Sequence, residues 1–193
     1  MYNYEAKVDS YEMEAELISQ IAYDVFNARS GSQLGLWAFG YTKFERNVTN
    51  TLKRMANNSK AFNDLLMEME YATGGTYKTT RVAINDINAM SEQQLNCLVF
   101  FIAQNSTVGL PKLAPKNKEI TSPVVVGLSG TKPENIVPYG GKMISIPHHY
   151  LDEDVDKIVQ AILDDKPWTT KGPSTTTRST FSRYFNSILT IPI

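Results

Sequence analysis

Residues 123–128, Pro-Val-Val-Val-Gly-Leu, form the clearest β-strand pattern in this chain of 193 residues. A short apolar run bounded by proline and glycine is typical of a strand that is buried on both faces. The segments before and after it follow different patterns, so we expect this strand to begin a sheet. The sequence therefore predicts an α+β fold, with a helical N-terminal half of about four helices followed by a small sheet.

The first half of the chain is dominated by helix signals. A first helix is expected from Asp9 or Ser10 to Gly31, because apolar side chains recur at helical spacing on one face, namely Leu17, Ile18, Ile21, Ala22 and Val25. Residues 42–45, Thr-Lys-Phe-Glu, form a capping box and predict the start of a second helix. A third helix begins at Ser59, and the short link between these two helices predicts an antiparallel hairpin.

Three further segments complete the first half. Residues 34–40 are apolar and interrupted by glycines, so we expect a buried connector. Residues 77–84 are rich in threonine, valine and isoleucine, which predicts a short strand. A capping box at residues 91–94 predicts a fourth helix, and its buried side would carry Leu95, Leu98, Val99 and Ile102.

A loop separates the two halves. Residues 106–122 contain two prolines, a glycine and three lysines and no clear periodicity. We expect a single domain, residues 1–193, with a sub-domain seam at 106–122 that separates helical residues 1–105 from mixed residues 123–193.

The second half combines strand and helix signals. Residues 136–146 predict a hairpin that turns at Gly140 and Gly141, which would make the sheet mostly antiparallel. One or two helices are expected after the sheet. The first is capped by Asp152, and a short second one would carry Phe181, Tyr184, Phe185, Ile188 and Leu189 on one face.

Composition and charge exclude several classes of protein. The net charge of −1 gives the whole molecule no general attraction for nucleic acid or an anionic membrane. Cys97 is the only cysteine, which excludes an intramolecular disulfide and a cysteine-based zinc site. The first residues lack a signal-peptide pattern and no apolar stretch is long enough to span a membrane, so we expect a cytoplasmic protein.

The densest polar cluster in the sequence runs from His148 to Asp156. Imidazoles and carboxylates together can act as acid and base, so the candidate catalytic residues are His148, His149, Asp152 and Asp154. Adjacent histidines on an extended segment point to opposite sides, so at most one of them could join the acids, and no metal site is predicted. The simpler interpretation is structural, because acids in the first turn of a helix interact favourably with its dipole.

A second candidate site follows the strand at 123–128. Its loop carries hydroxyls and a lysine that could hold a phosphate group, namely Ser129, Thr131 and Lys132. The spacing of a P-loop is absent, so an ordinary turn is the alternative interpretation.

The C-terminal tail contains no acid after Asp165. Its cations and one tryptophan could contact a partner or a nucleic-acid backbone, and these candidates are Lys166, Trp168, Lys171, Arg178 and Arg183. The neighbouring aromatic residues also fit a helical stripe that packs against the core, in which case they would not be free to stack on bases.

Three functions are compatible with these features. The first is a non-catalytic binding or regulatory accessory protein, of the kind that phages encode for interaction with the host, acting on a protein partner. The alternative is a small enzyme for a phosphorylated or nucleotide substrate, which requires the loops of Ser129 and His148 to open on one face within about 10 Å of each other. The third is single-strand nucleic-acid binding by the tail. No cofactor is predicted, and the sequence leaves the oligomeric state and the presence of enzymatic activity open.

Overall fold

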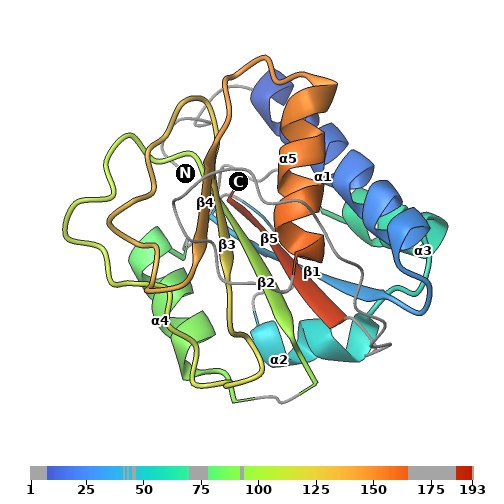
Figure 1. The fold of residues 1–193 in the computed structure, drawn as a ribbon, viewed down its shortest axis with the longest axis horizontal. Coiled ribbons are helices and arrows are strands. Elements are labelled where there is room, and N and C mark those ends of the chain that lie inside the picture. The colour runs from blue at the N-terminus through green and yellow to red at the C-terminus, as the bar shows by residue number, and fades with distance from the viewer. Residues whose placement is uncertain are drawn as a thin grey trace.

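The chain folds around a parallel β-sheet of five strands in the order β1-β5-β2-β3-β4 (Figure 1). The computed structural model describes residues 8–40, 42, 44, 47–69, 78–91, 94–164 and 186–192, and the side chains of residues 10–164 within them. The strands are β1 (Gln33–Phe39), β2 (Cys97–Ile102), β3 (Val124–Gly127), β4 (Lys142–Ser145) and β5 (Asn186–Pro192).

Helices cover both faces of the sheet. One face carries α1 (Val8–Ala28), α3 (Ser59–Met67) and α5 (Asp152–Leu163). The other face carries α2 (Val48–Thr51), the 3-10 turn η2 (Leu52–Arg54) and α4 (Thr80–Ala89). Figure 1 shows α1 and α5 side by side on one side of the sheet and α4 on the opposite side. The fold is therefore three layers deep, with the sheet in the middle.

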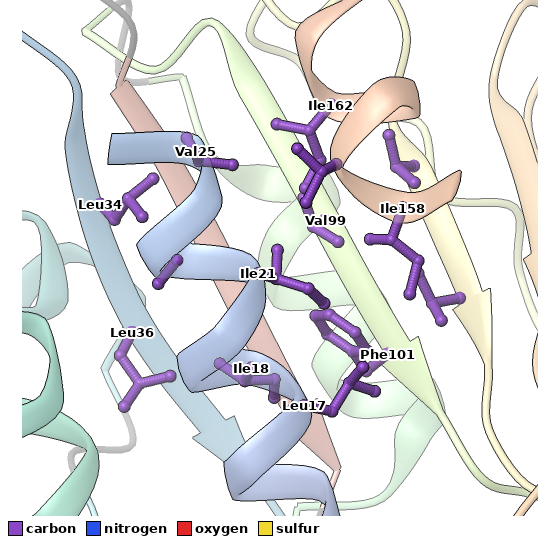
Figure 2. Close-up of a cluster of buried hydrophobic side chains, with 14 of the residues drawn as sticks. Leu17, Ile18, Ile21, Val25, Leu34, Leu36, Val99, Phe101, Ile158 and Ile162 are labelled. Carbon is purple, nitrogen blue, oxygen red and sulfur yellow. The ribbon is translucent and has the colours of Figure 1, made fainter. Parts of the chain in front are cut away.

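The two hydrophobic cores follow from the period of two along each strand. In β2, Val99 and Phe101 face α1 and α5, whereas Leu98 and Phe100 pack in the core beneath α4. Figure 2 shows the first of these cores, in which Ile18 and Ile21 of α1 and Ile158 and Ile162 of α5 lie over the sheet. Because both faces are covered, every residue of β2 is buried.

Strand β5 lies between β1 and β2. Leu189 aligns with Leu36 of β1 on one side and with Val99 of β2 on the other, and both pairings are parallel. The strand that comes last in the described chain therefore joins β1 to β2, β3 and β4.

A buried lysine ties the sheet to the helical layer. Lys142 of β4 is 1% exposed, and its ammonium donates to the carbonyls of Ala161 (2.7 Å) and Asp164 at the end of α5. Helix ends leave such carbonyls without partners, and a cation there also interacts favourably with the helix dipole.

Several predictions from the sequence are confirmed. The chain contains both helices and strands, the first helix occupies nearly the expected residues, and α3 begins at Ser59. The strand within 123–128 and the helix that begins at Asp152 are also present. No helix among the described residues is long and apolar enough to cross a membrane.

The predicted antiparallel sheet is wrong. Residues 136–141 are not a strand, and β4 pairs with β3 in parallel, with Met143 opposite Val125. Gly140 has a φ of 77° in a loop where Gly141 donates its amide to the carbonyl of Pro138. The two glycines thus make a turn, but this turn leads from a loop into β4 and does not join two strands.

The predicted helical N-terminal half is also wrong, because it contains two strands. Residues 34–40, expected as a connector, form most of β1, and part of the expected fourth helix is β2. Both strands are buried on both faces, so their sequences are continuously apolar and lack the alternation that identifies a half-exposed strand.

The opposite error occurs at residues 77–84, where a strand was expected and α4 is found. Thr79 is its N-cap, and the Thr79 hydroxyl accepts a hydrogen bond from the amide of Val82. Ala83, Ile84 and Ile87 then share the buried side of the helix. Capping and helical periodicity outweigh the β propensity of the threonines and valine here.

The expected helical hairpin does not form. The Thr42 hydroxyl accepts from the amide of Phe44, which makes a local turn, and the helix begins only at Val48, where Asn47 is the N-cap. Val48 packs in the core beneath α4, whereas Phe62 of α3 packs in the other core. The two helices therefore lie on opposite faces of the sheet.

The end of the chain differs from its prediction as well. Ile188 and Leu189 were expected in a short helix and lie in β5. Residues 165–185, including the cations of the tail, lie outside the described residues. The segment 106–122 connects β2 to β3, which pair directly, and its role as a sub-domain seam stays a prediction.

The position of β5 predicts that its removal prevents folding. Deleting residues 186–193 removes the strand that joins β1 to β2, a loss of more than about 5 kcal/mol, comparable with the whole stability of a domain. We expect the truncated chain to show no cooperative transition in thermal unfolding followed by circular dichroism. The full chain under the same conditions is the reference. A cooperative transition near the wild-type temperature in the truncated chain would contradict the central role of β5.

Candidate functional site

The carboxyl ends of all five strands meet at one edge of the parallel sheet. In open sheets of this kind, ligands bind at that edge, in the loops that follow the strands. Here the loops after β3 and β4 meet the beginning of α1 and enclose a pocket of about 20 Å³, which we call the edge pocket. Its lining includes Glu14, Leu17, Leu128, Ser129, Ile146 and His148. This volume has room for about one water molecule.

Ser129 presents its hydroxyl at this edge from a tight turn. Its φ is 51°, and it is the only non-glycine residue with a positive φ among the residues that the structure describes. The turn is held by two hydrogen bonds, from Gly130 to the carbonyl of Ile146 and from Thr131 to the carbonyl of Leu128. A left-handed conformation costs a serine about 1–2 kcal/mol, and such strain concentrates at functional sites.

Gly127 allows the turn to fold back on the end of β3. A Cβ atom at this position would lie 1.9 Å from the carbonyl oxygen of Thr131, which is far too close for any side chain. The glycine therefore permits the close approach of the loop that carries Ser129.

His148 lies against Ser129. The Ser129 hydroxyl oxygen is 3.2 Å from Nδ1 of His148, and both side chains are exposed. The hydroxyl donates this hydrogen bond when Nδ1 carries no proton. The two loops that the enzyme hypothesis requires to open on one face thus do so, and the rings of His148 and His149 meet edge to face at 4.8 Å.

Glu14 is the most unusual group in the edge pocket. It is 3% exposed, and neither of its carboxyl oxygens has a hydrogen-bond partner among the described residues. Burial raises its pKa well above the ordinary value of 4.5. A buried carboxylate without partners is strongly disfavoured, so this group favours the neutral carboxylic acid, which can donate a proton or a hydrogen bond.

Tyr150 is the remaining titratable group of the pocket lining. Burial, together with the charges of Glu16 and Asp152, raises the pKa of its phenol to about 12. It therefore stays protonated at neutral pH, where it can serve as a hydrogen-bond donor.

Neither of the two acids predicted beside the histidines lines the edge pocket. The Asp154 carboxylate accepts hydrogen bonds from Lys157 (2.9 Å) and from the amide of Leu151 (3.1 Å). The hydrogen bond from Lys157 is the main cause of the lowered pKa of Asp154. Asp154 thus caps α5 from inside its first turn, while Leu151 occupies the N-cap position and Asp152 is exposed.

The three residues proposed to hold a phosphate group differ in their exposure to solvent. Thr131 is buried and its carbonyl accepts from the Ser145 hydroxyl, whereas Lys132 is exposed and its carbonyl accepts from Thr107. Ser129 and Lys132 therefore present side chains to solvent on this loop. The candidates in the tail, from Lys166 to Arg183, lie outside the described residues.

Glu14 was missed by reasoning from the sequence, although a signal exists. It lies on the same face of α1 as Ser10, Leu17 and Ile21, at helical spacing, and all four are buried. An acid within an otherwise buried stripe is the feature that could have identified it.

A second hollow, which we call the acidic groove, lies between α1, α3 and α5 and has a volume of about 300 Å³. Its lining includes Tyr23, Asp24, Asp152 and Asp156. The pKa of Asp24 is raised by partial burial and by the charges of Asp156 and Asp152. Within the described ranges, no group of three or more histidine, cysteine, aspartate or glutamate side chains is arranged to hold a metal ion.

The chain was compared with family models, curated proteins and solved structures. No family model, no curated protein and no solved structure matches the chain at a significant level.

The state of Glu14 predicts how stability depends on pH. The folded protein binds the Glu14 proton more tightly than the unfolded chain does, so this residue makes stability fall as the pH rises above about 4.5. Glu14→Gln removes that fall, so the melting temperature of this variant should rise relative to that of the wild type as the pH increases above about 4.5. Glu14→Met should raise the free energy of unfolding at neutral pH by about 1–3 kcal/mol, because it removes the unpaired polar atoms.

Thermal unfolding at a series of pH values measures both effects. Glu12→Gln is the matched control, because Glu12 is an exposed acid on the same helix. Parallel pH profiles for wild type and Glu14→Gln would contradict the assignment of a raised pKa to Glu14.

Proposed function

We propose that this chain is a small enzyme that acts on a phosphorylated or nucleotide substrate at the exposed side chains of Ser129 and His148, beside the edge pocket. The contact of 3.2 Å between the Ser129 hydroxyl and Nδ1 of His148 carries this proposal. A hydroxyl paired with an imidazole is the arrangement that activates serine as a nucleophile, with histidine accepting its proton. The position of the pair at the carboxyl edge of a parallel sheet supports the same conclusion.

The substrate class follows from the groups around this pair. Lys132 is exposed on the loop that carries Ser129, and a lysine there can neutralise part of the charge of a phosphate group. The reaction we propose is the transfer of a phosphoryl group to water through Ser129, with His148 as the general base.

Phosphate release measured with nucleotides and with p-nitrophenyl phosphate tests this function. We expect turnover by the wild type and a loss of about 100-fold or more in Ser129→Ala and in His148→Ala, because each removes a group that takes part in the reaction. His149→Ala is the matched control, since the His149 ring touches His148 whereas the hydrogen bond of Ser129 goes to His148. Absence of turnover with every substrate, or equal rates in wild type and Ser129→Ala, would refute the proposal.

The binding-protein hypothesis is the second candidate, and the acidic groove favours it. Three carboxylates around a hollow with an exposed tyrosine would attract a basic segment of a partner protein. As an accessory protein of a phage, the chain would use such a surface on a protein of its host.

A cytoplasmic location is compatible with both candidate functions, and it stays a proposal. Binding of single-stranded nucleic acid by the tail also stays a proposal.

Binding of a lysine-rich peptide, measured by calorimetry at low and high salt, tests the acidic groove. We expect the double variant Asp24→Asn, Asp156→Asn to bind about tenfold more weakly at low salt, since charge attraction between partners is screened by salt. Asp64→Asn is the control, because Asp64 is an exposed acid on α3 that pairs with Lys60. Equal affinity in all three proteins would exclude the groove as a basic-peptide site.

A further inference from the structure

We infer that the outer side of β4 pairs with the outer side of β4 in a second copy of this chain, so that the two sheets join across a two-fold axis. We call this outer side the β4 edge. It is one border of the sheet, because β4 is the last strand in the order β1-β5-β2-β3-β4 (Figure 1). The inference is independent of the proposed function.

The backbone of β4 leaves hydrogen-bonding groups unpaired at this edge. The amide of Lys142 donates to the carbonyl of Pro123, on the side of β3, at 2.8 Å. Because backbone groups alternate in direction along a strand, those of Met143 and Ser145 point away from β3. These outward groups have no hydrogen-bond partner among the residues that the structure describes. The β4 edge therefore presents free amides and carbonyls.

The two borders of the sheet differ in how they are covered. Met143 is 44% exposed and Ser145 is also exposed, whereas Ile144 between them is buried in the core beneath α5. At the other border, Leu34 of β1 exchanges two hydrogen bonds of 2.8 Å with Ala56. An unpaired strand edge is a place where a further strand can pair, so the β4 edge is the border that can accept one.

The β4 edge is complementary to itself. When two copies run antiparallel about an axis at Ile144, Met143 of one copy lies opposite Ser145 of the second copy, and the symmetric pair repeats this contact. Residues placed opposite each other in this way exchange both of their hydrogen bonds. The outward amides and carbonyls of both copies are then paired through one surface that is the same on each side.

Exposed apolar side chains on both sides of the strand favour the same arrangement. Tyr139 precedes β4 and Leu151 follows it, and both are exposed. Because the axis at Ile144 lies near the middle between them, the Tyr139 end of one copy approaches the Leu151 end of the other. Burial of these side chains would add to the backbone hydrogen bonds. The net charge of −1 gives little repulsion between two copies.

Sedimentation equilibrium of the full chain tests the inference. The pairing is smaller than a standard protein interface, so we expect a weak dimer whose formation is visible between about 5 and 500 µM. The measured mass should rise across this range from the chain mass of 21.6 kDa to twice that value. A mass that stays at that of the single chain would overturn the inference. A mass that continues to rise beyond the dimer would overturn the two-fold pairing.

A charge at the β4 edge should weaken the dimer. Met143→Lys places a lysine from each copy at the interface, and lysine on an edge strand opposes pairing, so we expect association at least about tenfold weaker. Met67→Lys is the matched control, because Met67 is an exposed methionine on α3, which packs against β1 near the other border of the sheet. Equal association in the two variants would contradict the assignment of the interface to β4.

A proline at the same position tests the backbone pairing itself. Met143→Pro removes an outward amide and none of the amides that bond to β3, and proline is tolerated on edge strands. We expect association at least about tenfold weaker, with a melting temperature in dilute solution close to that of the wild type. A proline variant that dimerises like the wild type would overturn the inference. If this variant does not fold, Met143→Lys, which changes only an exposed side chain, decides the question.

Discussion

The parallel pairing of β5 with β1 on one side and β2 on the other is the contact on which the rest of the structure depends. Without it, β1 and the helices packed on it would have no connection through the sheet to β2, β3 and β4. Together with the parallel pairings of β3 with β2 and of β4 with β3, it places all carboxyl ends at one edge. The edge pocket exists because two of those ends, after β3 and β4, lie next to each other beneath the beginning of α1.

The same sheet offsets the costs that the site imposes. Ser129 has a positive φ, and the two buried oxygens of Glu14 have no hydrogen-bond partner among the described residues; each feature costs about 1–3 kcal/mol. Burial of a single large apolar side chain contributes a similar amount, about 1.5–3 kcal/mol. Phe100, Phe101 and Trp37 are each fully buried in the sheet, so the scaffold can tolerate a strained turn and an unpaired acid at its edge.

The sequence predicted α1, α5 and β3 correctly but missed β1, β2 and α4. α1 and α5 have the helical periodicity that exposure of one side produces, and both were found. β1 and β2 are covered on both sides, so their sequences lack the alternation of apolar and polar residues that identifies a half-exposed strand. β3 was recognised because its short apolar run is bounded by proline and glycine. Ser129 and His148 were identified as candidates, but their contact depends on the parallel register of β3 and β4, which no local pattern contains.

Two buried acids show how the fold distinguishes structure from chemistry. Asp154 is 9% exposed, is bonded to Lys157 and to the amide of Leu151, and has a lowered pKa, so it stays ionised and stabilises the beginning of α5. Glu14 is still more deeply buried, has no partner among the described residues, and has a raised pKa. Sites that use acid and base at one pH are built from groups whose surroundings push their pKa values apart. Both carboxyls are buried, and the hydrogen bond that Asp154 receives from Lys157 lowers its pKa, whereas burial raises the pKa of Glu14, which receives no hydrogen bond from the described residues.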